Sequence, residues 1–441
     1  MIQLPIPTFI INLKKRNDRK AHILEEFRGR TEFSINLVEP IFDKIGAVSL
    51  WKTINHIIQN LAHENDEYIL ICEDDHQFTD AYSKLLFSKC IDEAIEKKAD
   101  VLSGGVHWFN SGLQITDHLF WVDRFTATQF IIIFKHFFNT ILRTDFSVND
   151  TADYKISALS NSKFFIAPFI SVQKDFGYSD ATFKNNVERK MEKLFAKSSA
   201  NVQMLKDVVA FYTNQHLKGL RQESFGDISI PTYIISHQKK VEASKYIEKE
   251  FVGKKEFEIT IVEGCKHDSD SVSLWLSLRK IIEMAIANDD DVIIICEDSH
   301  EFTGHYSRNF LIKNIIEAYD QGVEILLGSV GSFGLAVPIA INRVWLNHFY
   351  NARFMILYRS VFQKILNEPF DDNIKFDAVL SYTTSRKMVF FPPISTQHDS
   401  PNDGFMDILD EDNELCISLL EGADKKLIKI YEALNTHHIS L

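Results

Sequence analysis

The chain has 441 residues, which is too long for one ordinary hydrophobic core and fits two domains of about 200 residues each. Its composition, 45% hydrophobic and 25% charged with only 17 Gly and 10 Pro, indicates a globular protein and excludes a fibrous or disordered one. The formal net charge of -13 argues against nucleic acid as a partner, because nucleic acid requires a basic face.

The first part of the chain alternates between strand and helix patterns. The apolar run 7–13 has no basic region before it and no small-residue cleavage site, so we expect a first strand and not a secretion signal. The spacing predicts a helix over 18–27, a strand over 33–39 and an amphipathic helix over 48–61. The nearly continuous apolar run 67–72 is typical of a strand covered on both faces. This order predicts an α/β fold with a mostly parallel, doubly wound sheet.

The apolar runs and the cysteines indicate in which compartment the protein is expected. The later apolar runs, such as 130–134, are far shorter than the roughly 20 residues that a membrane-spanning helix needs. The five cysteines have no CxxC spacing, and Cys72 and Cys296 lie inside strand-like runs, so we expect reduced core thiols. We therefore expect a cytoplasmic protein without a transmembrane segment, and the oligomeric state stays open.

The sequence contains an internal duplication. Shifting the chain by 224 residues aligns 7–83 with 231–307 without a gap, and 31 of these 77 positions are identical. The same register later aligns PFISVQ (168–173) with PPISTQ (392–397). Because the period is far longer than that of solenoid repeats, each copy is expected to be a complete domain with its own core.

Two segments with helical composition, 185–220 and 411–434, are expected to close the two copies. The predicted organisation therefore has four parts in chain order, namely a first α/β domain, a helical closing segment and linker, a second α/β domain, and a C-terminal helical segment. Their boundaries are 1–183, 184–226, 227–403 and 404–441.

Three carboxylates, Glu73, Asp74 and Asp75, directly follow the apolar run 67–72. In a parallel sheet they would lie at the carboxyl ends of the strands, where ligands bind. Oxygen ligands of this kind suit Mg²⁺ or Mn²⁺ and commonly bridge the ion to a diphosphate. The alternative is that these residues only end a strand and cap a helix.

The exit of the first predicted strand is basic. The segment 12–19 reads NLKKRNDR and would place Arg and Lys opposite the acidic turn, where they would pair with phosphates. The alternative is a solvated run of charges.

Together, several motifs resemble glycosyltransferase family 25, the lipopolysaccharide and collagen galactosyltransferase-like group with a GT-A fold. They are INLKKRNDR, GAVSLW before a helix, YILICEDD, Asp153 and a final PFISVQKDFGYSD, and they cover essentially all of the first copy. The resemblance implies two tandem GT-A-like, Rossmann-like domains. It also implies inverting transfer of a hexose from a UDP-sugar to an acceptor hydroxyl on a glycan, a lipid-linked carrier or a protein.

The resemblance, the chemistry of the reaction and the positions of residues at strand ends together give expected roles for individual residues. A divalent ion on the diphosphate stabilises the leaving group, and a carboxylate must accept the proton of the acceptor from the opposite face. Glu39 ends the second strand, a place that meets the ribose or base in α/β nucleotide sites, although a structural role is an equal alternative. The expected roles are nucleotide binding for Asn12, Arg16, Arg19, Glu39 and Asp74, metal binding for Glu73 and Asp75, proton acceptance or helix capping for Asp153 and Asp123, and the closing element for Gln173 and Ser179.

The second copy departs from this pattern. It keeps Glu297 and Asp298 but has Ser299 in place of Asp75, and Asn12, Arg16 and Arg19 become Ser236, Lys240 and Ala243. We therefore expect a catalytically degenerate copy that acts as a scaffold or an acceptor platform. A second metal site of different composition is the alternative, built from His300, Glu301, His398 and Asp399.

The leading hypothesis is thus a metal-dependent hexosyltransferase with its active site in residues 7–180. One competitor is a non-catalytic carbohydrate- or nucleotide-binding protein made of two decayed copies. The other is a nucleotidyltransferase, which would release pyrophosphate and not UDP.

Overall fold

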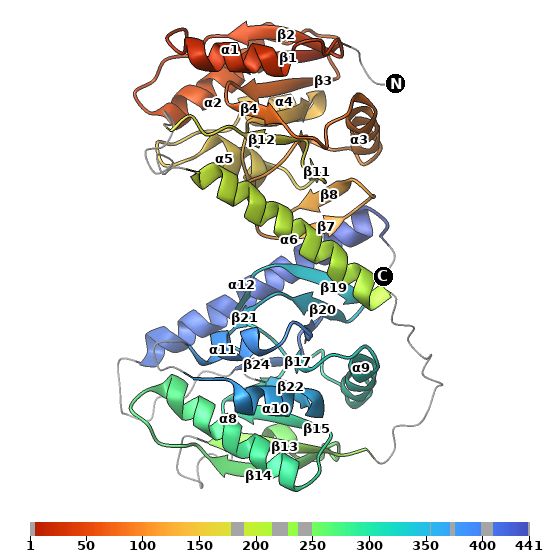
Figure 1. Ribbon diagram of the computed structural model, residues 1–441. Helices are drawn as coiled ribbons and strands as arrows, with labels where there is room; N and C mark the ends of the chain where they lie inside the picture. Colours follow the sequence, from red (N-terminus) through yellow and green to blue (C-terminus); the bar gives the residue numbers. More distant parts are fainter. Residues whose placement is uncertain are drawn as a thin grey trace. The chain divides into compact units, whose positions relative to one another are not determined.

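The computed structural model describes residues 5–177, 189–213, 228–236, 249–352, 354–370, 375–397 and 409–439, with only the backbone for 409–417. The chain divides into two compact units, residues 1–207 with 433–440, and residues 208–432 with 441. Both units combine a mixed sheet with helices, as Figure 1 shows, so the expected tandem α/β architecture is confirmed.

Unit one is built on an eight-stranded sheet with the order β2-β1-β3-β10-β5-β11-β8-β7. Only β10 and β8 run against the direction of the other six strands, so the sheet is mostly parallel. The strands are β1 Ile6–Ile11, β2 Phe33–Val38, β3 Tyr68–Glu73, β5 Val101–Ser103, β7 Gly112–Gln114, β8 Leu119–Val122, β10 Phe130–Phe134 and β11 Lys163–Ile166.

The remaining elements of unit one surround this sheet. Two short antiparallel pairs join β4 His76–Phe78 to β12 Ser171–Gln173 and β6 Trp108–Phe109 to β9 Phe125–Thr126. The helices are α1 Asn17–Glu26, α2 Gly46–His56 with the π-helical turn η1 Ile57–Leu61, α3 Lys84–Glu96, α4 Lys135–Leu142, α5 Ala152–Leu159 and α6 Lys190–Thr213.

Unit two repeats this plan with the sheet order β14-β13-β15-β22-β17-β23-β20-β19. The sheet strands are β13 Ile230–Ser236, β14 Phe257–Glu263, β15 Val292–Glu297, β17 Ile325–Leu327, β19 Ala336–Ala340, β20 Arg343–Leu346, β22 Phe354–Tyr358 and β23 Lys387–Phe390. The short pairs are β16 His300–Phe302 with β24 Ser395–Gln397 and β18 Ser332–Phe333 with β21 Phe349–Tyr350. The helices are α8 Asp270–Ala287, α9 Arg308–Asp320, α10 Arg359–Asn367, α11 Phe376–Thr383 and α12 Leu409–Thr436.

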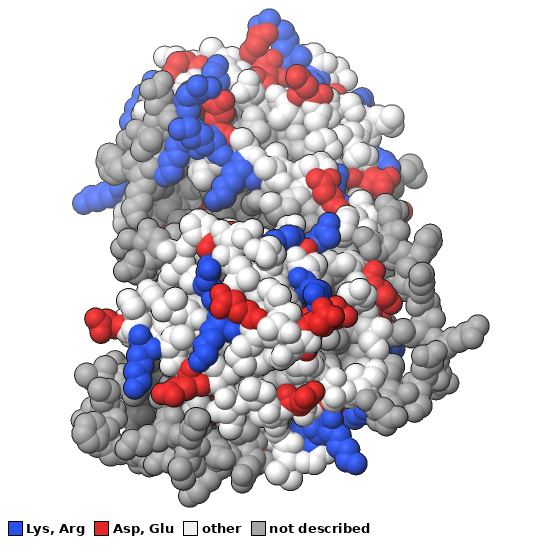
Figure 2. Space-filling view, turned by 60° about the horizontal axis from the view of Figure 1, so that its bottom comes forward, with Lys and Arg blue, Asp and Glu red and all other residues white. Residues whose placement is uncertain are grey.

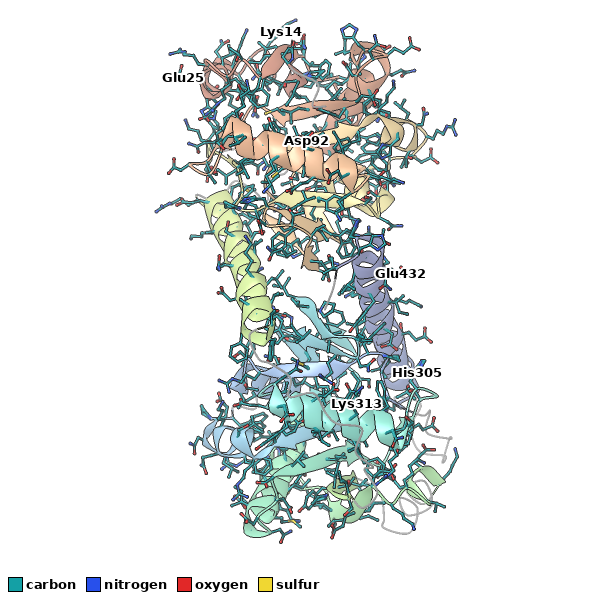
Figure 3. The ribbon with its side chains drawn as sticks, turned by 90° about the vertical axis from the view of Figure 1, so that its right-hand side faces the viewer. Lys14, Glu25, Asp92, His305, Lys313 and Glu432 are labelled. Atoms are coloured by element: carbon teal, nitrogen blue, oxygen red, sulfur yellow. The ribbon has the colours of Figure 1, made fainter. Side chains whose placement is uncertain are left out.

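Burial follows the position of each strand in the sheet. Central β3 and β10 are almost wholly buried, and residues such as Ile69, Ile71 and Ile132 have no exposed surface. Burying an aliphatic side chain of this size contributes about 1.5–3 kcal/mol. Edge strand β2 exposes Ile35 and Leu37 instead. Figure 3 shows α3 in front of its sheet and α9 in front of the sheet of unit two, with Asp92 and Lys313 on the exposed sides of these helices.

Paired contacts confirm that the duplication extends to side chains. Trp51 stacks on Phe146 with ring centroids 4.8 Å apart, and Trp275 stacks on Phe370 at 4.9 Å. The buried His76 has its Nδ1 2.8 Å from Ser171 Oγ, and the corresponding distance for His300 and Ser395 is 2.9 Å. These histidines are structural in both copies.

The predicted closing helices are present as α6 and α12. The division between the compact units falls inside them, between residues 207 and 208 and between 432 and 433. The boundaries expected from the sequence, at 183, 226 and 403, lie outside the described residues and stay predictions.

The described helices, cysteines and surface charges bear on the expected location of the protein and its partners. None of the described helices is both long and apolar enough to span a membrane. The thiols of Cys72, Cys90 and Cys296 are free and buried, and that of Cys265 is free and partly exposed. On the face shown in Figure 2, the acidic and basic side chains of the described residues are interspersed.

Candidate functional site

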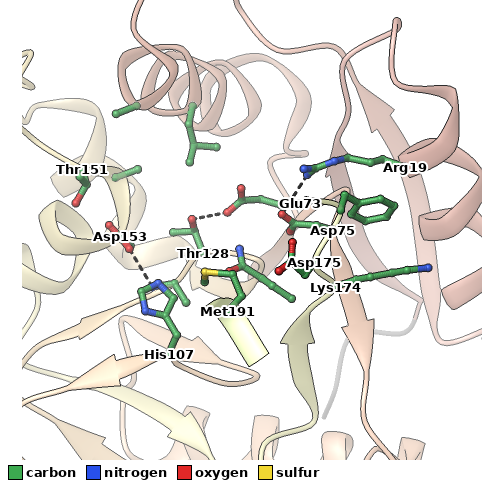
Figure 4. A pocket seen from close by; sticks show the side chains of 16 residues that line it. Arg19, Glu73, Asp75, His107, Thr128, Thr151, Asp153, Lys174, Asp175 and Met191 are labelled. Atoms are coloured by element: carbon green, nitrogen blue, oxygen red, sulfur yellow. Dashed lines mark hydrogen bonds and ion pairs between the residues drawn. The ribbon is translucent and has the colours of Figure 1, made fainter. Parts of the chain in front are cut away.

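A pocket opens in unit one beside the carboxyl end of β3. The empty space within it is about 850 Å³, including space continuous with solvent. Helices α1, α2, α5 and α6, the end of β3, and the end of β12 all contribute to the wall, as expected for a ligand site in an open α/β sheet. The lining residues are Arg19, Ala47, Leu50, Glu73, Asp75, His107, Ala127, Thr128, Thr151, Ala152, Asp153, Gln173, Lys174, Asp175, Phe176 and Met191 (Figure 4).

The two carboxylates that were expected to hold a metal both line this pocket. Glu73 Oε1 accepts a hydrogen bond of 2.6 Å from Thr128 Oγ1. Burial, and then the nearby charge of Asp75, raise the pKa of Glu73 to about 8. Burial also raises the pKa of Asp75 to about 6, although the Arg19 charge opposes this shift. Asp75 Oδ1 is buried and has no hydrogen-bond partner among the described residues.

These features fit a cation. Two partly buried acidic groups that repel one another are stabilised by a positive charge between them, and an unsatisfied carboxylate oxygen supplies a ligand. Among the described residues, no three His, Cys, Asp or Glu side chains are grouped closely enough to hold a metal by themselves. Mg²⁺ beside a diphosphate commonly takes only one or two carboxylates, the rest being phosphate and water oxygens. Glu73 and Asp75 therefore fit an ion that shares its ligands with a nucleotide.

The strand-exit residues form a buried network behind the acidic turn. Asp74 accepts hydrogen bonds from Asn12 Nδ2 at 2.8 Å and from Arg19 Nη1 at 3.0 Å. The same Arg19 nitrogen donates to Asp75 Oδ2 at 3.1 Å. Arg19 reaches the pocket wall, whereas Asn12, Arg16 and Asp74 are buried and are not among the lining residues. Asn12 and Arg19 thus hold Asp74, the middle residue of the acidic turn, from behind the pocket wall.

Two further predicted residues also lie away from the pocket wall. Glu39 follows β2 and pairs with Lys14 Nζ at 2.5 Å, with both side chains largely exposed. Asp123 follows β8, is buried, and accepts a hydrogen bond of 2.9 Å from Asn110 Nδ2. Neither residue is among those that line the pocket, and Ser179 lies outside the described residues.

Asp153 lines the pocket from the first turn of α5. Its Oδ2 accepts a hydrogen bond of 3.0 Å from the backbone N–H of Ala127, which has a positive φ of 128°. Its negative charge acts to raise the pKa of both Glu73 and His107. Figure 4 shows Asp153 and His107 facing one another on one side of the pocket, while Arg19 and Lys174 lie on the other.

The structure adds lining residues that sequence reasoning did not single out. Lys174 and Asp175 follow Gln173 at the end of β12, inside the motif PFISVQKDFGYSD, but the motif predicts no role for them. Thr128 and His107 come from loops flanking β9 and β6, where no residue pattern marks a ligand site. Only the folding of these loops onto the end of β3 reveals them.

The second copy keeps the framework of this site and loses part of its polar lining. Ser236 Oγ donates to Asp298 Oδ2 at 2.9 Å, in the place of the Asn12 bond to Asp74. The residues at the positions of His107 and Thr128 are Gly331 and Ala352. His300 is buried with its Nδ1 close to Ser395 Oγ, and Glu301 pairs with Lys249; the alternative metal site stays a prediction, because its other two residues are not described. Lys240, Ala243, His398 and Asp399 lie outside the described residues.

Comparison with known proteins found no matching family model and no matching curated protein. Among solved structures, an apo UDP-glucose pyrophosphorylase is 13% identical, with a TM-score of 0.27 over 45% of this chain and 82% of that one. A putative glucose-1-phosphate thymidylyltransferase from Bacillus anthracis is 10% identical, with a TM-score of 0.26 over 43% of this chain and 75% of that one. A mannosyltransferase from Pyrobaculum calidifontis in complex with GDP-Man and Mn²⁺ is 10% identical, with a TM-score of 0.24 over 55% of this chain and 83% of that one. At these values the likenesses assign no function to the chain.

Proposed function

We propose that unit one is a divalent-cation-dependent glycosyltransferase that binds a UDP-hexose and transfers the hexose to an acceptor hydroxyl with inversion. One observation carries the proposal. Two partly buried carboxylates, Glu73 and Asp75, repel one another on the wall of an open pocket at the end of a parallel strand, and one oxygen of Asp75 is unsatisfied. A cation that arrives with a diphosphate would satisfy both groups.

The lining residues divide the chemical work between two sides of the pocket. Glu73 and Asp75 would hold the cation, and Arg19 and Lys174 would add positive charge near the diphosphate. The bound ion would offset the negative charge that develops on UDP as the anomeric C–O bond breaks. Because Asp74 binds Arg19 from behind, the guanidinium is held in place before the nucleotide binds.

The acceptor would enter from the side of Asp153, opposite Arg19 and Lys174. An inverting reaction requires a base on that side, because the acceptor oxygen attacks the face opposite the leaving group. The acceptor itself is proposed only as a hydroxyl of a glycan, a lipid-linked carrier or a protein.

The test is release of UDP from UDP-sugars with and without Mn²⁺, for the wild type, Asp75→Ala and Glu297→Ala. Glu297, the counterpart of Glu73, is an acidic-turn carboxylate of the second copy and serves as the control for removing a carboxylate outside unit one. We expect Mn²⁺-dependent release that falls about 10²–10³-fold in Asp75→Ala and is unchanged in Glu297→Ala. Release of pyrophosphate would instead indicate a nucleotidyltransferase, and UDP binding without turnover would indicate a binding protein.

A further inference from the structure

We infer that His107 and Asp153 form one proton-accepting pair for the acceptor hydroxyl, with the imidazole of His107 taking the proton. The inference rests on the proposed glycosyl transfer and assigns a catalytic residue that neither the acidic turn nor the basic loop contains. The two side chains line the same side of the pocket, from different parts of the chain.

Local contacts hold the imidazole in position. The backbone N–H of His107 donates to Thr126 O at 3.2 Å, at the edge of the β6-β9 pair. Its Nδ1 lies 3.1 Å from Thr126 Oγ1. The ring of Phe195 contacts the imidazole edge-on with centroids 6.0 Å apart. One nitrogen and one edge of the ring are therefore fixed while the side chain still reaches the pocket.

The charged groups around the ring set its protonation state. Burial lowers the pKa of His107, the Asp153 carboxylate opposes this by raising it, and Lys190 lowers it. A neutral imidazole can accept a proton, and an adjacent carboxylate stabilises the imidazolium that results. Asp153 therefore acts on His107 as a nearby negative charge, while Thr126 and Phe195 orient the ring.

Comparison with the second copy distinguishes the role of Asp153 from that of His107. Its counterpart Asp377 accepts a hydrogen bond of 2.8 Å from Asn351 N, which repeats the bond of Asp153 to Ala127. The counterpart of His107 is Gly331, whose N–H still donates to the opposite strand, to Tyr350 O at 2.9 Å. The backbone of this region therefore forms without the histidine, and the aspartate has a structural contact that persists in both copies.

The losses in the second copy follow one pattern. The pocket residues Asp75, His107 and Thr128 are replaced together by Ser299, Gly331 and Ala352. Asp377, which has the structural bond, is kept. Of the two cation-side carboxylates, Glu73 is kept as Glu297 and Asp75 is lost; the histidine is lost together with Asp75 while the backbone of the region is retained.

The step balances as follows. The acceptor oxygen forms a bond to the anomeric carbon, and its proton passes to the His107 imidazole. The bond between the anomeric carbon and the diphosphate oxygen breaks, and UDP leaves with the electron pair. The imidazolium, stabilised by Asp153, then releases the proton to solvent, so the products are the glycoside, UDP and one proton.

The test compares His107→Gly, which copies the residue of the second copy, with the control His118→Asn, which copies Asn342. His118 contacts Ala167 O and does not line the pocket. UDP affinity with Mn²⁺ is measured by calorimetry, and kcat is measured from pH 5.5 to 8.5 at saturating Mn²⁺, with and without added imidazole. His107→Gln repeats the measurement with a side chain that fills the space.

We expect His107→Gly to lower kcat about 10²–10⁴-fold while the UDP affinity stays within about twofold. The acidic limb of the wild-type pH profile should disappear, and imidazole should restore at least a tenth of the lost activity of His107→Gly but none of His107→Gln. A His107→Gly enzyme with wild-type kcat, with an unchanged acidic limb, or with an equal loss of UDP affinity would overturn the assignment. A wild type that binds no UDP with Mn²⁺ would instead refute the proposed function itself.

Discussion

Replacing Glu73 by Gln should stabilise the metal-free protein while removing its response to Mn²⁺. Buried beside Asp75, Glu73 has its pKa raised from 4.5 to about 8. An acid whose pKa is higher in the folded than in the unfolded state destabilises the fold increasingly as the pH rises from the unfolded pKa to the folded one. At pH 7 the shift corresponds to about 3 kcal/mol, and because Glu73 retains contact with solvent we expect Glu73→Gln to gain about 1–2 kcal/mol.

For a unit of this size, a gain of that magnitude raises Tm by about 2–8 °C. Differential scanning calorimetry in EDTA at pH 7 measures it, with Glu297→Gln as the matched control in the second copy. Near pH 4, where the glutamate is protonated in both states, the gain should vanish. Mn²⁺ with UDP should raise the Tm of the wild type but not that of Glu73→Gln. A variant that is less stable than the wild type in EDTA, or one that Mn²⁺ and UDP still stabilise, would refute the reasoning.

Three further predictions test other parts of the account. The affinity for Mn²⁺ in the presence of UDP, measured by calorimetry, should increase by up to about tenfold per pH unit from pH 6 to 8. The reason is that the raised pKa of Glu73 makes the ion compete with a proton, and an affinity that does not change with pH would contradict this. Asp74→Ala should lower the free energy of unfolding by about 2–4 kcal/mol in urea titrations, since it removes the partner that Arg19 and Asn12 share; a loss below about 0.5 kcal/mol would show that the network is dispensable. Gly105→Ala should lower the free energy of unfolding by at least about 1–3 kcal/mol in urea titrations, because a Cβ there would lie only 2.2 Å from Ser171 O. A variant as stable as the wild type would show that this close approach can relax.

The sequence predicted the fold well because the fold follows from local and repeated patterns. The buried run 67–72 appears as β3, the segment 18–27 as α1, and the gap-free shift of 224 residues becomes two sheets of identical strand order. One local detail differs. The helix expected over 48–61 is regular only as far as His56 and continues as the π-helical turn η1.

The candidate site was less predictable, because its wall depends on where loops fold. Glu73 and Asp75 could be predicted to line the pocket because they lie at the carboxyl end of β3. The charge of Arg16 gave no sign that its side chain would be buried and would not line the pocket. His107 is separated from Asp153 by 46 positions in the chain, and only the tertiary structure brings them to one side of the pocket.

The central claim is that Glu73 and Asp75 hold a divalent ion on a nucleoside diphosphate in unit one. A crystal structure with Mn²⁺ and UDP, with anomalous data collected at the manganese edge, tests it most directly. We predict a manganese peak in contact with Asp75 and the diphosphate, and a nucleotide in the pocket lined by Arg19 and Lys174. A nucleotide bound elsewhere, or bound in this pocket with no manganese beside Asp75, would contradict the account.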